Sequence, residues 1–145
     1  MIIFNQQAYP KNYLGKTKYT IARWGCLTVC VTMIYDYLFN KQTTPDTMAQ
    51  KLEYNINGNL LWYSLKNIGL KLVTRVRYFN KSIIDAAVKN PNQFIALEVN
   101  SCHWVWVIGR YIPVLGYRIV DPLRGDKAYS SRYRSITGFA IISKQ

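Results

Sequence analysis

The sequence predicts an α+β fold in which N-terminal helices pack on a mostly antiparallel sheet formed by the C-terminal half. Three observations support this. Residues 27–69 hold helix-like segments, residues 70–78 alternate apolar and polar side chains, and short apolar runs separated by turn residues follow residue 93. The chain has 145 residues, half of them hydrophobic, and no repeat or Pro/Gly/Ser-rich linker. We therefore expect a single domain over residues 1–145.

The first predicted helix follows an irregular start. Residues 1–25 contain the breakers Pro10 and Gly15, so regular structure is not expected there. The segment from Leu27 to Phe39 is apolar on nearly every side, which is typical of a buried helix. This helix is expected to form the centre of the N-terminal half.

Two further helices are predicted before the sheet. In residues 40–55, Thr44 suits the N-cap, Pro45 the first helical position and Asp46 the first turn. Residues 58–70 predict a short third helix, with Asn59 as its cap and Gly69 as its stop.

The periodicity then changes from helical to extended. Residues 70–78 place apolar side chains and basic side chains on opposite faces, which is the pattern of a strand. A helix is expected in residues 81–90, ending before Pro91. Four more strands are predicted, in residues 94–100, 103–112, 116–122 and 136–143.

The charge balance indicates the class of partner. The formal net charge is +12, which favours anionic partners such as nucleic acid, acidic cell-wall polymers or membrane surfaces. The basic residues are scattered, and the sequence contains no helix-turn-helix, Cys/His finger or base-stacking motif. Nucleic acid is therefore not the expected partner, and the charge is interpreted as a general electrostatic bias.

No membrane span is predicted. The longest apolar run, from Leu27 to Phe39, is about 13 residues long and contains Asp36, so it is too short and too polar to cross a bilayer. The N-terminus lacks a charged start followed by a long apolar region, so no signal peptide is expected. We expect a cytoplasmic protein, or alternatively one packaged in a virion or released on lysis.

Three cysteines, an odd number, argue against a disulfide framework and for free thiols. Cys30, inside the apolar helix, is expected in the core, and Cys102 likewise. A zinc site of Cys26, Cys30, Cys102 and His103 is a weaker alternative, because neighbours on a strand point to opposite faces and no C-x-x-C knuckle is present.

Cys26 differs from the other two because it lies where the buried helix begins. Free backbone N–H groups and the helix dipole favour a thiolate there, which is the nucleophilic form. Gly25 would keep the approach open for a substrate, and Trp24 is a candidate for the entrance. A Gly-Cys pair alone is a weak signal, so a partner base is required.

The chain has one histidine, His103, at the start of a predicted strand. Taken alone, it could be a buried structural residue. One strand later, Asp121 precedes Pro122, and antiparallel pairing can bring its carboxylate beside the imidazole, where it would orient the ring and stabilise its charged form. The alternative for Asp121 is an Asx turn.

These residues occur in a pattern that resembles the papain-like cysteine peptidases, and most closely the C39-like peptidase family. The resemblance runs over nearly the whole chain, through "FNQ", "YTIARWGC", "TTPDTM", "GNLLW", "HWVWVIGR" and "YRIVDPLRG". It implies a papain-like fold with Cys26 as nucleophile, His103 as base and Asp121 as its orienting group. Gln6, favoured over Gln7 by the "F-x-Q" context, would supply an oxyanion-hole donor.

The resemblance implies a thiol protease that hydrolyses a peptide or protein substrate through a thioester and needs no metal or organic cofactor. One alternative is a phage-lysin-like hydrolase of bacterial wall peptides, since walls are anionic and the chain is basic. Another is a non-catalytic basic structural or binding component of a phage particle, because a fold does not fix a function.

Overall fold

The structure, a computed structural model, describes residues 1–145 and contains seven helical segments and six strands. The helical segments are η1 (Gln6–Ala8), α1 (Ile21–Trp24), α2 (Cys26–Phe39), α3 (Pro45–Lys51), η2 (Trp62–Ile68), α4 (Lys81–Val88) and η3 (Ser130–Arg132). The strands are β1 (Leu70–Val76), β2 (Gln93–Val99), β3 (His103–Ile112), β4 (Gly116–Asp121), β5 (Asp126–Tyr129) and β6 (Ile136–Lys144). The predicted α+β class is confirmed.

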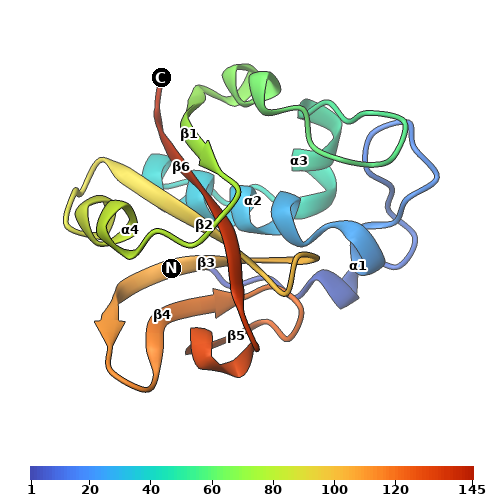
Figure 1. Cartoon of the computed structure of the whole chain (residues 1–145). Coiled ribbons are helices and arrows are strands. Elements are labelled where there is room, and N and C mark those ends of the chain that lie inside the picture. The colour runs from blue at the N-terminus through green and yellow to red at the C-terminus, as the bar shows by residue number, and fades with distance from the viewer.

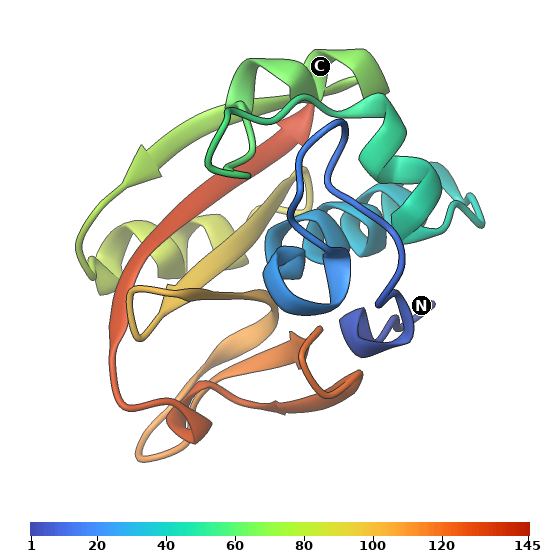
Figure 2. The same cartoon turned by 90° about the vertical axis from the view of Figure 1, so that its right-hand side faces the viewer.

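All six strands belong to one antiparallel sheet with the order β1-β6-β2-β3-β4-β5 (Figure 1). The C-terminal strand β6 therefore lies inside the sheet, between β1 and β2. Helices α1, α2 and α3 lie on one side of the sheet, and α4 lies near β2 and β3 on the other side (Figures 1 and 2). None of the helices is both long and apolar enough to traverse a bilayer.

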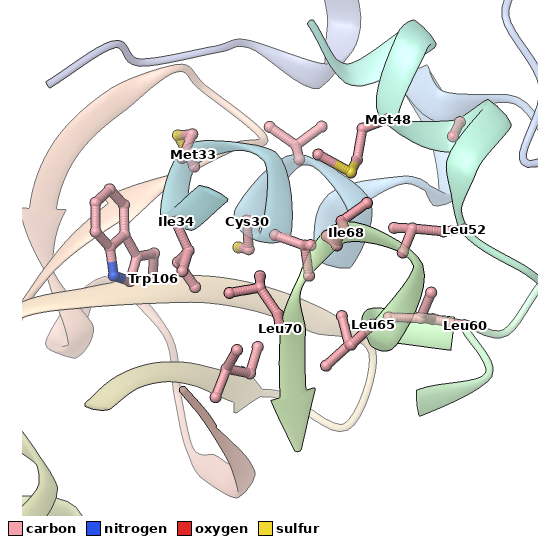
Figure 3. Packing of buried hydrophobic residues seen from close by; sticks show 14 of the residues in the cluster. Cys30, Met33, Ile34, Met48, Leu52, Leu60, Leu65, Ile68, Leu70 and Trp106 are labelled. Atoms are coloured by element: carbon pink, nitrogen blue, oxygen red, sulfur yellow. The ribbon is translucent and has the colours of Figure 1, made fainter. Parts of the chain in front are cut away.

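The larger apolar cluster fills the space between α2, α3, η2 and one face of the sheet and comprises 18 buried residues. Figure 3 shows Cys30, Ile34 and Leu70 pointing toward one another, with Trp106 of β3 closing one end. Because α2 is covered on nearly all sides, it has little freedom to shift. The helix that carries Cys26 is thus held by the core, as its apolar sequence predicts.

The opposite face of the sheet carries a second cluster of 11 buried residues, covered by α4 through Ile84 and Ala87. The two clusters draw on alternate residues of the same strands: Phe94 and Trp106 face α2, whereas Ile95 and Val107 face α4. This is the two-residue period of a strand buried on both faces.

Several details differ from the predictions. Residues 62–68 form a 3₁₀-helix rather than an α-helix, and its N-cap is Leu61, so the assignment of Asn59 as the cap is wrong. Gly69 ends this segment as predicted, in the left-handed conformation with φ +77°. Thr44 occupies the N-cap of α3, although its side chain makes no capping hydrogen bond. The short strand β5 and the helical turns η1, α1 and η3 were not predicted, because three or four residues show no measurable periodicity.

Helices α1 and α2 meet at Gly25, and this junction determines where α2 begins. A Cβ atom on Gly25 would lie 2.7 Å from both the Cα and the carbonyl oxygen of Ile21. Both are backbone atoms, so neither can move without shifting α1. Glycine is therefore required here by the close approach of two backbone segments, and not by the accessibility of the nucleophile.

We expect Gly25→Ala to lower the free energy of unfolding by about 1–3 kcal/mol, because the added methyl group overpacks a backbone contact. Urea denaturation followed by circular dichroism measures this change. Gln42→Ala, at an exposed position beyond the far end of α2, serves as the control and should change stability by less than about 0.5 kcal/mol. Equal stability of the two variants would show that the α1–α2 contact tolerates a side chain.

Candidate active site

Cys26 is the first residue of α2, and its side chain is mostly buried, with 7% of the residue exposed. The helix is interrupted at Gly25, so the backbone N–H groups of Cys26, Leu27 and Thr28 donate no backbone hydrogen bond. Such free N–H groups at a helix start stabilise negative charge. Three unpaired N–H groups thus lie at the start of α2, where the sequence places Cys26.

His103 is the first residue of β3, and 8% of the residue is exposed. It follows a hairpin turn in which Asn100 and Ser101 have φ of 53° and 59°, the signature of a type I′ turn. The turn is fixed to the start of β6, because Ser101 N–H donates to the Thr137 hydroxyl at 3.0 Å. The backbone just before His103 is thus held by the hairpin turn itself and by the contact with β6.

Asp121 is the last residue of β4 and is fully buried. Strands β3 and β4 are antiparallel, with Trp106 opposite Val120, which brings the end of β4 next to the start of β3. Nε2 of His103 lies 2.8 Å from Oδ1 of Asp121, so the two side chains are hydrogen-bonded as predicted. This pairing leaves the other ring nitrogen, Nδ1, available, and the Cys26 side chain contributes to the raised pKa of the imidazole.

Three more donors complete the hydrogen bonding of the Asp121 carboxylate. The backbone N–H of Leu123 donates to Oδ1 at 3.0 Å, Nη1 of Arg132 donates to Oδ2 at 3.1 Å, and the Tyr133 hydroxyl also donates to Oδ2. The ring of Tyr133 lies 5.2 Å from the imidazole of His103, centroid to centroid, so Tyr133 contacts both members of the His103–Asp121 pair.

Arg132 is itself oriented by a second carboxylate. Its two terminal nitrogens donate to the two oxygens of Asp126 at 2.8 and 2.9 Å, a bidentate pair. Arg132 thereby connects β5, where Asp126 lies, to the end of β4. The sequence does not predict a role for Arg132, Tyr133 or Asp126. Asp126 lies in the four-residue strand β5 and the other two lie in or after the short η3, and segments of this length leave no periodic signal.

The ionisation of His103 reflects competing effects. Burial disfavours the charged imidazolium, but the hydrogen bond to Asp121 and the interaction with Cys26 outweigh it and raise the pKa of His103 to about 9. Burial likewise opposes the charge on Asp121, but the donors His103 and Tyr133 lower the pKa of that carboxyl to about 2. At neutral pH the carboxylate and the imidazolium are therefore the prevailing forms.

The same pKa shifts link ionisation to stability, with opposite signs. The raised pKa of His103 contributes stability that is fully present below its ordinary pKa of 6.5 and is lost as the pH rises through about 9. The lowered pKa of Asp121 contributes stability that is present above 3.8 and is lost as the pH falls through about 2. Both contributions are fully present between pH 3.8 and pH 6.5, so the pair is most stabilising in that range.

Gln6, in η1, is the buried member of the Gln6–Gln7 pair, with 2% of the residue exposed. Its Nε2 donates to the carbonyl oxygen of Ala22 at 3.0 Å, and its Oε1 has no hydrogen-bond partner. Its backbone N–H donates at 2.8 Å to the carbonyl of Pro122, directly after Asp121. Gln7 also donates to Ala22, but it is exposed. The structure thus holds Gln6 between α1 and the end of β4.

The two predicted substrate-binding residues differ in environment. Gly25 is buried against α1 and offers no open surface. Trp24 is 53% exposed beside the nucleophile, packs edge-on against Tyr19 at a centroid distance of 5.6 Å, and has the Arg23 guanidinium 5.4 Å from its ring centroid. Trp24 is therefore exposed two residues before Cys26, whereas Gly25 acts through packing, and the substrate-binding role of Trp24 stays a prediction.

The other two cysteines have different environments. Cys30 is fully buried, as predicted, and its Sγ lies 3.5 Å from the carbonyl oxygen of Trp104. The prediction that Cys102 belongs to the core is wrong: it is exposed, because it ends the tight turn before β3 instead of lying within the strand. No three His, Cys, Asp or Glu side chains are grouped so that they could hold a metal ion.

Comparisons with known proteins bear on the fold. Neither the scan against protein-family models nor the search of curated proteins gives a match. Among solved structures, the chain is similar to a double glycine motif protease from an AMS/PCAT transporter, crystallised in complex with the leader peptide. The TM-score is 0.61, with 17% sequence identity over 99% of this chain and 97% of that chain. The chain therefore has the fold of this protease over its whole length, as its resemblance to the C39-like peptidases implies.

Proposed function

We propose that the chain is a cysteine peptidase that hydrolyses peptide bonds with Cys26, His103 and Asp121. The observation that carries the proposal is the His103–Asp121 hydrogen bond of 2.8 Å in a buried position. Cys26, at the start of α2, also helps to raise the pKa of the imidazole. A nucleophile, a base and an orienting carboxylate in this order are the components of thiol-based acyl transfer. The fold shared with a double glycine motif protease supports the proposal.

The reaction follows from the ionisation of the pair. The Cys26 thiolate attacks the carbonyl carbon of the substrate, and an S–C bond forms as the carbonyl oxygen becomes an oxyanion. The His103 imidazolium then gives its proton to the leaving amine, the C–N bond breaks, and a thioester remains on Cys26. Water, deprotonated by the now neutral imidazole, attacks the thioester and releases the new carboxyl group and the thiol.

The oxyanion requires donors that are not already engaged. The Cys26 backbone N–H meets this requirement, since it donates no backbone hydrogen bond. The Gln6 amide offers a second donor, because only one of its two N–H bonds is needed for the contact with Ala22. One such donor is worth about 100- to 1,000-fold in kcat.

The substrate class is proposed to be a peptide or protein. The similar protease was crystallised with a leader peptide, which favours a peptide substrate here as well. The net charge of +12 is the observation that favours wall peptides as an alternative substrate, because it would hold the enzyme on an anionic polymer.

Thiol reactivity tests the nucleophile. We expect iodoacetamide to alkylate Cys26 at pH 7 at least about tenfold faster than the exposed Cys102, because the imidazolium and the helix start stabilise the thiolate. Peptide mass mapping of the three cysteines gives the three rates in one experiment, and the fully buried Cys30 should remain unlabelled. In His103→Ala, the rate at Cys26 should fall to that of Cys102 or below. A wild-type Cys26 that reacts no faster than Cys102 would refute the proposed function.

A second variant tests whether Arg132 is a positioning residue. We expect Arg132→Ala to lower kcat about 10- to 100-fold with KM nearly unchanged, because the Asp121 carboxylate loses a charged donor and the imidazole loses its alignment. Arg134→Ala is the matched control, since Arg134 is exposed and belongs to no salt bridge. A change in KM alone, or equal activity of the two variants, would contradict this role.

A further inference from the structure

A large cavity lies on the helical side of the molecule, away from the catalytic side chains. It has a volume of about 870 Å³ and is lined by residues 15–18 of the N-terminal loop, by Gln50 of α3, by residues 52–56 after α3, and by Leu61. The two walls are in direct contact, since a Cβ on Gly15 would lie 3.2 Å from the ring of Tyr54. Figure 2 shows both segments on the side of the molecule where α2 begins.

The cavity adjoins the first turn of the helix that carries the nucleophile. Tyr54 lines the cavity, and its hydroxyl lies 2.7 Å from the hydroxyl of Thr28, two residues after Cys26 on α2. Tyr19, next to the cavity residue Lys18, packs against Trp24, two residues before Cys26. Tyr54 and Tyr19 thus connect the cavity to residues that flank Cys26 in the sequence.

Two lysines on the wall of this cavity form no salt bridge, and Nζ of Lys18 lies 5.8 Å from the centroid of the Tyr19 ring. Lys16 and Lys18 are both exposed on its wall, and neither takes part in a salt bridge. The backbone N–H groups of Gly15, Lys16 and Lys18 donate no hydrogen bond within the protein. Two ammonium groups and several free N–H donors on one loop form a surface that favours carboxylates.

The one acidic residue of the lining, Glu53, is already engaged elsewhere. Its Oε1 accepts from the Tyr63 hydroxyl at 3.1 Å, and its Oε2 accepts from Nδ2 of Asn67 at 3.2 Å. Neither Tyr63 nor Asn67 lines the cavity, and each of them holds one carboxylate oxygen of Glu53. Glu53 forms no salt bridge with Lys16 or Lys18.

We propose that this cavity binds an acidic segment of the substrate peptide, at a distance from the bond that is cleaved. The proposal rests on the proposed function for the identity of the ligand as substrate, and it adds the chemistry of recognition: Asp or Glu side chains held by Lys16 and Lys18. The exposed Ile56 on the opposite wall, 89% exposed, offers an apolar contact to residues beside the acidic ones. Specificity would then come from a segment that the catalytic residues do not touch.

The test uses peptide binding to the full chain and requires no catalysis. Acetylated and amidated hexaglutamate is titrated into ¹⁵N-labelled Cys26→Ala protein, with hexaserine as the uncharged comparison. We expect amide shifts confined to residues 15–18 and 50–61, none with hexaserine, and weaker binding at higher salt. The double variant Lys16→Ala/Lys18→Ala should raise the Kd about 2- to 30-fold, as two exposed ion pairs are lost.

The charge-matched control is Lys41→Ala/Lys89→Ala, which removes two lysines that do not line the cavity and should leave the Kd unchanged. Shifts spread over the whole basic surface, or equal weakening by both double variants, would overturn the proposal. Failure here is distinguishable from failure of the proposed function: a reactive Cys26 with no binding at the cavity rejects only the acidic subsite. An unreactive Cys26 with localised binding rejects only the peptidase.

Discussion

The structure around the candidate site depends on the burial of one charge, the carboxylate of Asp121. A buried carboxylate is strongly unfavourable unless donors replace the water that it has lost, and Asp121 has four of them. Three of these donors are side chains from β3 and from the segment after β5. Satisfying this one group therefore fixes the end of β4, the start of β3 and the chain around Arg132 relative to one another.

The position of the sulfur depends on a different constraint, the packing of α2. The helix is covered by the larger apolar cluster, and Gly25 lets α1 approach so closely that α2 begins at Cys26. Apolar packing thus places the thiol, and a buried polar network places the imidazole. The raised pKa of His103 depends on both placements, since Cys26 and Asp121 each contribute to it.

The sequence allowed the main helices, five of the six strands and the His103–Asp121 pairing to be predicted, because His103 and Asp121 each lie at the end of a segment with clear periodicity. The roles of Cys26, His103 and Asp121 in catalysis stay a prediction. It did not allow Arg132, Tyr133 or Asp126 to be identified, since contacts between residues on short irregular segments depend on the tertiary fold. Cys102 was misassigned for a related reason. It ends a type I′ turn of which only two residues have positive φ, and such a short turn exposes the thiol at the surface.

The central claim is that His103 is charged at neutral pH because its imidazole is hydrogen-bonded to a buried carboxylate and because Cys26 also raises its pKa. Since the chain has one histidine, its imidazole signals in an NMR pH titration are unambiguous. The account predicts a midpoint near pH 9 in the wild type and a lower midpoint in Cys26→Ala, where only Asp121 still stabilises the imidazolium. A midpoint near the ordinary value of 6.5 in the wild type, unchanged in Cys26→Ala, would contradict it.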